Sequence, residues 1–204
     1  IEMISEVAKE FEIENKKQVV TAVDNTYMGP IWQHPLNIGA DLTIYSATKY
    51  LGGHSDLIAG AVMGNQDLMN RVKVLRTFLG NMISPNTAWL MLRSLETLKL
   101  RMDKQCENAK KVAQFLTTHD KIEKVYYLGL LQEGDKGFDI YKKQCTQPGA
   151  MISFDIRGKE KDAFTFLNHL KLIKLAVSLG STESLAQHPS SCLLYTSPSP
   201  RDIS

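Results

Sequence analysis

Apolar and polar residues alternate along the first part of the chain in blocks that suit short strands and amphipathic helices. Three apolar runs, at 18–23, 42–45 and 57–63, have the length and composition of buried strands. The stretches 1–11 and 67–78 carry apolar residues at helical spacing. Because helices alternate with strands, the pattern predicts an α/β layer with a mostly parallel sheet. The first helix is expected to lie on that sheet.

Ser84-Pro85 gives the clearest element boundary in the chain. Serine is a favoured N-cap and proline is tolerated at the first helical position, so a helix is predicted to begin here. The following residues, 86 to about 119, contain no glycine and no proline. They predict either one long helix that bridges two domains or two helices with a bend near Arg101.

After residue 119 the pattern becomes that of a small α+β unit. The expected elements are a strand at 122–131 that ends in a turn, a short helix at 140–144, a strand at 150–156, a helix at 161–170 and a strand at 172–180. We therefore expect residues 1–100 to be part of a large domain and residues 101–191 part of a small C-terminal domain. Residues 192–204 contain two Ser-Pro pairs and no periodicity, which predicts a disordered or artefactual tail.

One lysine stands in a tight loop between two predicted strands. Ser46-Ala47-Thr48-Lys49 follows an apolar run, and a Gly-Gly-His turn comes next. A lysine near buried surface can lose its proton and form a Schiff base with a carbonyl, and nearby hydroxyl and N–H groups can hold a phosphate. Asp24 ends another apolar run, and strand ends are where α/β proteins place ligand contacts. A lysine and an aspartate on neighbouring strand ends fit pyridoxal phosphate (PLP), because the carboxylate keeps the pyridine nitrogen protonated.

Each of these residues also has an ordinary structural interpretation. A loop lysine is usually a solvated charge, and Ser or Thr before a turn often only shapes the turn. Asp24, in the sequence Asp-Asn-Thr, could equally cap a turn or a helix.

The longer string around these residues resembles a known family. Residues 23–62, and within them SATKYLGGHSD, are similar to the PLP-lysine region of the Cys/Met-metabolism (trans-sulfuration) enzymes. The likeness continues through ISPNTAWLMLRSLETLKLRM and LAVSLGSTESLAQHPSS, and so covers about residues 15–191. By this resemblance the fold is α/β, part of a PLP-dependent transferase-like (aspartate aminotransferase type I) large domain followed by a small α+β C-terminal domain.

The resemblance also assigns roles to individual residues. Lys49 would hold PLP and act as the catalytic base, and Asp24, Ser46 and Thr48 would be further cofactor-binding residues. Ser178 would lie near the substrate carboxylate, although it could also be a strand-end cap. The implied reaction is γ-elimination from a sulfur amino acid, with methionine giving 2-oxobutanoate, methanethiol and ammonia. A cystathionine γ-lyase, or a cystathionine γ-synthase or β-lyase, is the alternative.

Enzymes of this family work as homotetramers with shared active sites, so the resemblance implies a homo-oligomer. It also implies that this chain begins well into the large domain and stops before the arginine that binds the substrate carboxylate. An inactive truncated fragment is therefore the non-enzymatic alternative.

Composition and charge narrow the remaining function classes. The net charge is +2, from 24 scattered basic and 22 acidic residues, which gives no footprint for nucleic acid. No apolar run approaches the length of a membrane span, and three cysteines are too few for a disulfide framework, so a cytoplasmic location is expected. His54 and Asp56 lack a third metal ligand nearby, so we expect no metal site there and instead loop-shaping hydrogen bonds.

Overall fold

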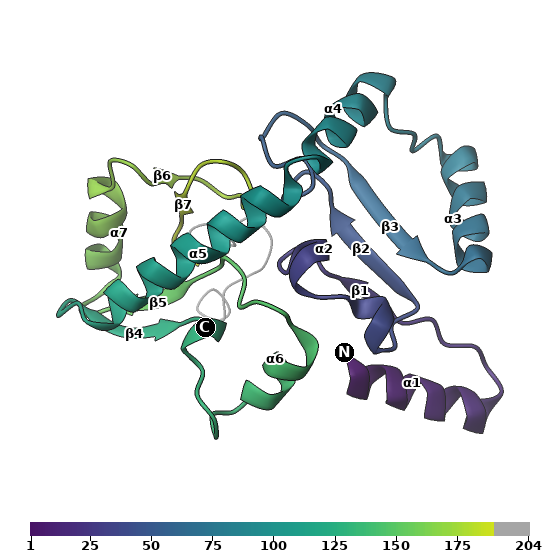
Figure 1. Ribbon diagram of the computed structural model, residues 1–204, viewed down its shortest axis with the longest axis horizontal. Coiled ribbons are helices and arrows are strands. Elements are labelled where there is room, and N and C mark those ends of the chain that lie inside the picture. Colours follow the sequence, from purple (N-terminus) through teal and green to yellow (C-terminus); the bar gives the residue numbers. More distant parts are fainter. Residues whose placement is uncertain (190–204) are drawn as a thin grey trace, which may run out of the picture.

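The computed structural model describes residues 1–189, and its first half is built on a three-stranded sheet in the order β1-β2-β3 (Figure 1). The strands are β1 (Ala22–Asp24), β2 (Leu42–Ser46) and β3 (Gly60–Gly64). β1 and β2 are parallel, whereas β2 and β3 are antiparallel. The strands predicted at 42–45 and 57–63 are therefore confirmed, and the one predicted at 18–23 is shortened to Ala22–Asp24. The sheet is mixed rather than mostly parallel. The reason is that residues 47–59 join β2 to β3 without a crossover helix, and such a direct connection returns the chain antiparallel.

The helical segments of this half are α1 (Glu2–Asn15), α2 (Gly29–Trp32), the 3-10 turn η1 (Pro35–Ile38) and α3 (Gln66–Leu79). α3 begins at Asn65, whose side chain accepts the Leu68 N–H at 2.9 Å. α1 forms as predicted but does not lay its apolar residues on the sheet. Instead, the buried Ser5 of α1 packs against Gly39, the residue after η1. Ile4 and Phe11 stay exposed.

The long helical stretch is two helices, α4 (Pro85–Leu95) and α5 (Leu98–Thr117). The predicted start is confirmed, because the Ser84 hydroxyl accepts the Thr87 N–H at 3.1 Å. The break lies at residues 96–97 and not near Arg101. Arg101 instead folds back and donates at 2.9 Å to the Ser94 carbonyl, which also accepts the Thr97 N–H at 3.3 Å, so it adds a side-chain contact across the break. α5 then runs diagonally across the molecule (Figure 1).

The elements after α5 lie around that helix (Figure 1). They are β4 (Ile122–Tyr126), the 3-10 turn η2 (Leu128–Leu130), α6 (Phe138–Gln144), β5 (Ser153–Ile156), α7 (Glu160–His169), β6 (Lys174–Leu175) and β7 (Leu185–Ala186). α6 extends towards α1, where Lys143 forms an ion pair with Glu2 (Figure 1). β4 and β5 pair antiparallel, and β6 and β7 form a two-residue parallel pair. The strand expected at 172–180 is thus reduced to two residues, and the rest of that stretch is loop. The tail predicted from residue 192 lies outside the described residues.

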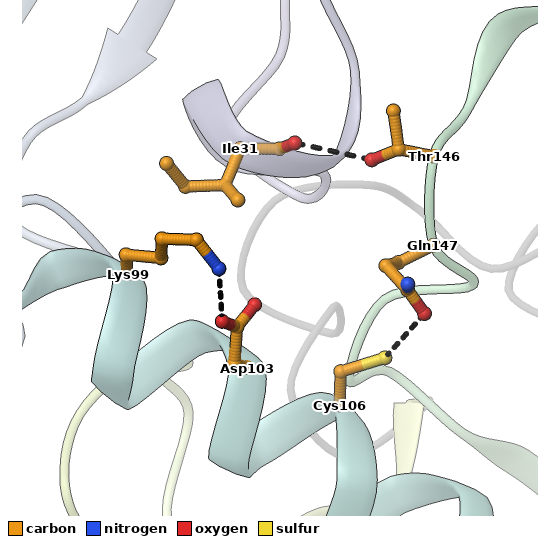
Figure 2. A network of polar contacts seen from close by, with 6 residues as sticks. All are labelled: Ile31, Lys99, Asp103, Cys106, Thr146 and Gln147. Atoms are coloured by element: carbon orange, nitrogen blue, oxygen red, sulfur yellow. Dashed lines mark hydrogen bonds and ion pairs between the residues drawn. The ribbon is translucent and has the colours of Figure 1, made fainter.

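A buried cluster joins the two halves at the foot of the lysine loop. Its members are Trp32, Tyr50, Leu98, Met102 and Cys106, which come from α2, the lysine loop and α5. The segment after α6 contacts α2 and α5 beside this cluster (Figure 2). There the Thr146 hydroxyl donates to the Ile31 carbonyl at 3.1 Å, and the Cys106 Sγ lies 3.8 Å from Gln147 Oε1. None of the helices within residues 1–189 combines the length and the apolar character that a membrane span requires.

Candidate functional site

Two strand ends and one loop meet at one edge of the sheet. Because β1 and β2 are parallel, with Asp24 opposite Ile44, their carboxyl ends point to the same edge. Asp24 is the last residue of β1 and Ser46 the last residue of β2. β3 starts at this edge too, with Gly60 opposite Ser46. The lysine loop, residues 47–59, therefore stands directly above the ends of all three strands.

Asp24 is held in place by Thr26, which was not among the predicted site residues. Asp24 Oδ1 accepts both the N–H of Thr26, at 3.0 Å, and the Thr26 hydroxyl, at 2.6 Å. The Thr26 Oγ1 in turn accepts the N–H of Ser46 at 2.8 Å, and it is almost fully buried. Asp24 thus does cap a turn, as its alternative interpretation allowed. Its other oxygen, Oδ2, has no hydrogen bond within residues 1–189 and stays available to a ligand. The Asp-x-Thr spacing of a side-chain-capped turn was the signal that could have identified Thr26.

The two hydroxyls before the lysine differ in how they are used. The Thr48 Oγ1 accepts the Ala59 N–H at 3.1 Å and faces the Ala59 carbonyl at 3.4 Å, so it fastens the start of the loop to its end. The hydroxyl of the half-buried Ser46 has no hydrogen bond in the described part of the chain. The geometry therefore leaves Ser46 free for a phosphate and gives Thr48 a loop-closing contact.

Lys49 meets a residue that is very distant in the sequence. Its Nζ donates to the Ser178 hydroxyl at 3.1 Å, across a separation of 129 residues. Both side chains are half-buried, so the amine is sheltered yet reachable. The backbone around Lys49 is tightly turned, since Gly53 donates its N–H to the Lys49 carbonyl at 2.7 Å. The loop from β6 thus brings a hydroxyl to the lysine.

His54 shapes the same loop. Its Nδ1 lies 2.7 Å from the Gly52 carbonyl, so that nitrogen must carry the proton and donate. The Ser94 hydroxyl is 3.4 Å from the same nitrogen and links the loop to α4. The expected loop-shaping role of His54 is confirmed. Asp56 makes no side-chain hydrogen bond within the described residues, so the same expectation is not met there.

Comparison with known proteins places the chain in a family. The description "Cys/Met metabolism PLP-dependent enzyme" belongs to the family profile that matches residues 1–199. The chain belongs to this family. The match confirms the predicted resemblance, and it extends into the predicted tail.

Several family members are similar over most of this chain. L-methionine gamma-lyase of Fusobacterium nucleatum subsp. polymorphum is 47% identical over 171 residues, which are 83% of this chain and 43% of that protein. Cystathionine gamma-lyase of Sus scrofa is 46% identical over 172 residues, 84% of this chain and 42% of that protein. The crystal structure of cystathionine gamma-lyase from Lactobacillus plantarum complexed with L-serine matches with a TM-score of 0.85 at 36% identity, over 96% of this chain and 50% of that one. The chain spans about half the length of the relatives it matches.

The chemistry of the side chains at this edge fits the PLP that defines the Cys/Met metabolism family. An aspartate with one unbound oxygen can accept the N–H of a protonated pyridine, and an unengaged hydroxyl at Ser46 can donate to a phosphate. Lys49 supplies the amine, and its described partner is a neutral hydroxyl rather than a carboxylate, so no ion pair competes for it. The residues present therefore match the pyridine nitrogen, the phosphate and the aldehyde of the cofactor.

Proposed function

We propose that this chain carries the cofactor lysine of a PLP-dependent carbon–sulfur lyase that acts on a sulfur amino acid by γ-elimination. The observation that carries the proposal is the Lys49–Ser178 contact of 3.1 Å beside the strand ends of Asp24 and Ser46. Methionine is the substrate we favour. With one water molecule it would give 2-oxobutanoate, methanethiol and ammonia.

The residues of the site divide the work of this reaction. Bound PLP supplies an electron-withdrawing ring that stabilises negative charge at the substrate Cα. Asp24 would keep the ring nitrogen protonated. Lys49 Nζ removes the proton at Cα and delivers protons in the later steps. Ser178 Oγ directs the amine by accepting its hydrogen bond, and Ser46 holds the phosphate, with Thr48 keeping the loop in place.

Cystathionine is the alternative substrate, in a γ-lyase or in the related γ-synthase or β-lyase. This alternative is kept because the chain is nearly as similar to a cystathionine gamma-lyase, at 46% identity, as to an L-methionine gamma-lyase, at 47%. Assembly into a homotetramer, and the division at residue 100 into a large and a small domain, are part of the same proposal.

Borohydride trapping of PLP tests the cofactor assignment on the chain as it stands. The chain is mixed with PLP, reduced, digested and analysed by peptide mass spectrometry. We expect a phosphopyridoxyl group on Lys49 and its loss in Lys49→Ala. Lys9→Ala, which removes an exposed lysine from α1, is the matched control and should keep the adduct. An adduct spread over several surface lysines, or one that survives in Lys49→Ala, contradicts the assignment.

Substrate choice is tested separately, because the chain spans about half the length of its relatives and the assay needs a full-length enzyme. A chimera completed with the remaining segments of the Fusobacterium enzyme is assayed for thiol release from methionine and from cystathionine. A higher kcat/KM for methionine supports the favoured substrate, and a higher value for cystathionine supports the alternative. A chimera that traps PLP on Lys49 but releases no thiol from either one overturns the lyase proposal.

A further inference from the structure

α5 touches both of the loops that meet at the candidate site. Arg101 and Gln105 are four residues apart on this helix, so their side chains leave the same face one turn apart. Arg101 Nη1 donates at 2.9 Å to the carbonyl of Tyr50, the residue directly after the lysine. Gln105 Nε2 donates at 3.0 Å to the carbonyl of Ser181, in the loop that carries the serine. One helix face therefore holds both loops by their backbones.

Every nitrogen of the Arg101 guanidinium donates a hydrogen bond near these loops. Its Nη2 binds the Ser94 carbonyl and its Nε donates to the Thr97 hydroxyl at 3.1 Å, so all three nitrogens are used. It forms no ion pair within residues 1–189. The lysine loop wraps closely around it at Gly53, where a Cβ would lie 1.9 Å from Nη1. A planar group with donors in fixed directions suits such a multiple contact, which a lysine ammonium cannot reproduce.

The second loop approaches the first at Gly180. A Cβ on this residue would lie 2.6 Å from the Tyr50 nitrogen and 2.9 Å from the Lys49 carbonyl carbon. Those are backbone atoms of the lysine itself and its neighbour, so they cannot yield without moving Lys49. The φ of Gly180 is +79°, which also favours glycine. Gly180 therefore permits the close approach that carries the serine to the lysine.

We propose that Arg101, Gln105 and Gly180 are positioning residues that set the contact between Lys49 and Ser178. The assignment rests on the proposed function for its meaning, because it is the cofactor lysine that is being directed. The two contacting side chains are 129 residues apart, and no backbone pairing between their loops joins them within the described residues. The helix face and the close glycine contact fix their separation instead.

The test measures the reactivity of the Lys49 amine without PLP. The folded chain is treated with trinitrobenzenesulfonate, and modification of Lys49 is followed by peptide mass spectrometry with Lys9 as the internal standard. Loss of the acceptor in Ser178→Ala should raise the Lys49 rate about two- to tenfold, the worth of one hydrogen bond. Gln105→Leu and Gly180→Ala should each raise it similarly. Combined with Ser178→Ala, neither should raise it further, because the contact they position is already gone.

Matched variants separate positioning from general destabilisation. Gln114→Leu makes the same change on an exposed turn of α5. Gly80→Ala imposes a similar backbone penalty, since its φ is +71°, but a Cβ there meets nothing within 4 Å. Both should leave the Lys49 rate unchanged. Arg101→Lys, which cannot reproduce the contacts of the guanidinium, should raise the Lys49 rate as Gln105→Leu does. If Gly180→Ala does not fold, these two variants carry the test alone.

Three results would overturn the inference. The Lys49 rate could be the same in Ser178→Ala as in the wild type, which would mean that the contact is not formed. The Lys49 rate could stay unchanged in Gln105→Leu and Arg101→Lys. Alternatively, the positioning variants could raise the rate by the same factor whether Ser178 is present or replaced by alanine. The labelling uses no cofactor, so a failure of PLP trapping would count against the proposed function and leave this measurement intact.

Discussion

Thr26 links the ends of both parallel strands through a single hydroxyl. It donates to the carboxylate that ends β1 and accepts the N–H of the residue that ends β2. The hydroxyl is buried, so the Ser46 N–H loses its partner when the hydroxyl is removed, whereas the exposed Asp24 carboxylate can turn to water. Thr26 therefore couples the orientation of Asp24 to the position of Ser46.

Thr26→Val should be clearly destabilising although it hardly changes the volume of the side chain. It leaves the half-buried Ser46 N–H without its partner and removes one of the two hydrogen bonds to Asp24 Oδ1, at a cost of about 1–3 kcal/mol. Urea unfolding gives the free energy, and PLP trapping on Lys49 should weaken in parallel.

Thr43→Val is the matched control. Thr43 lies on β2 and is 3% exposed, and its hydroxyl has no hydrogen-bond partner in the part of the chain that the structure describes. Removing a buried, unpaired hydroxyl should leave the free energy of unfolding unchanged or raise it. Equal losses in Thr26→Val and Thr43→Val would show that the Thr26 hydroxyl has no special role.

At the residue scale the sequence predicts chemistry better than contacts. Lys49, Asp24 and Ser46 could be selected because each follows an apolar run, and strand ends collect ligand groups. The partner of Lys49 could not be derived that way, since Ser178 is 129 residues away and its placement depends on α5 and Gly180. Thr48 shows a different limit, because its hydroxyl is used by Ala59 and no local pattern reveals that.

At the scale of elements, caps were easier to predict than breaks. Ser84 and Pro85 specify the start of α4 through local hydrogen bonding alone. The break before α5 carries no glycine or proline to announce it, because it is stabilised by Arg101, which folds back from the next helix to the Ser94 carbonyl. Sheet direction was likewise hidden, since it depends on whether the lysine loop contains a crossover helix.

α5 also carries a charge cluster whose effect on stability should depend on pH. Hydrogen bonds from Lys111, at 2.5 Å, and Lys104, at 2.9 Å, lower the pKa of Glu107 from 4.5 to about 2. A folded-state pKa below the ordinary value gives stability that is present above pH 4.5 and is lost as the pH falls towards 2. Because Glu107 is on the surface, the effect should be small and should shrink in high salt.

The measurement compares urea unfolding of the wild type and Glu107→Gln at several pH values between 7 and 3. The wild type should be more stable at neutral pH, and the difference should narrow on acidification through the window of about 4.5 to 2. Glu10→Gln, on an exposed turn of α1 and without an ion pair in the described residues, should show no such pH-dependent difference. A Glu107→Gln difference that is constant with pH would contradict the ion-pair explanation.

At the scale of the whole molecule, a large apolar surface remains open on α3. Leu68 is buried, but an exposed stripe follows on the helix: Val74, Leu75, Phe78 and Leu79. Contiguous apolar surface of this kind marks an interaction face or an aggregation risk in a soluble protein. We therefore predict that the chain self-associates through α3, in keeping with the expected homo-oligomer.

Phe78→Lys tests this prediction, because it places a charge in the middle of the stripe. Sedimentation velocity over a wide concentration range should show wild-type association that weakens in this variant. Leu172→Lys is the control, since Leu172 is 89% exposed, as Phe78 is at 84%, but lies outside α3. If both variants associate like the wild type, α3 is not the interface. If both weaken association equally, general charge repulsion is the cause and the stripe has no specific role. Loss in Phe78→Lys alone assigns the contact to α3, because the two substitutions add the same charge at sites of similar exposure.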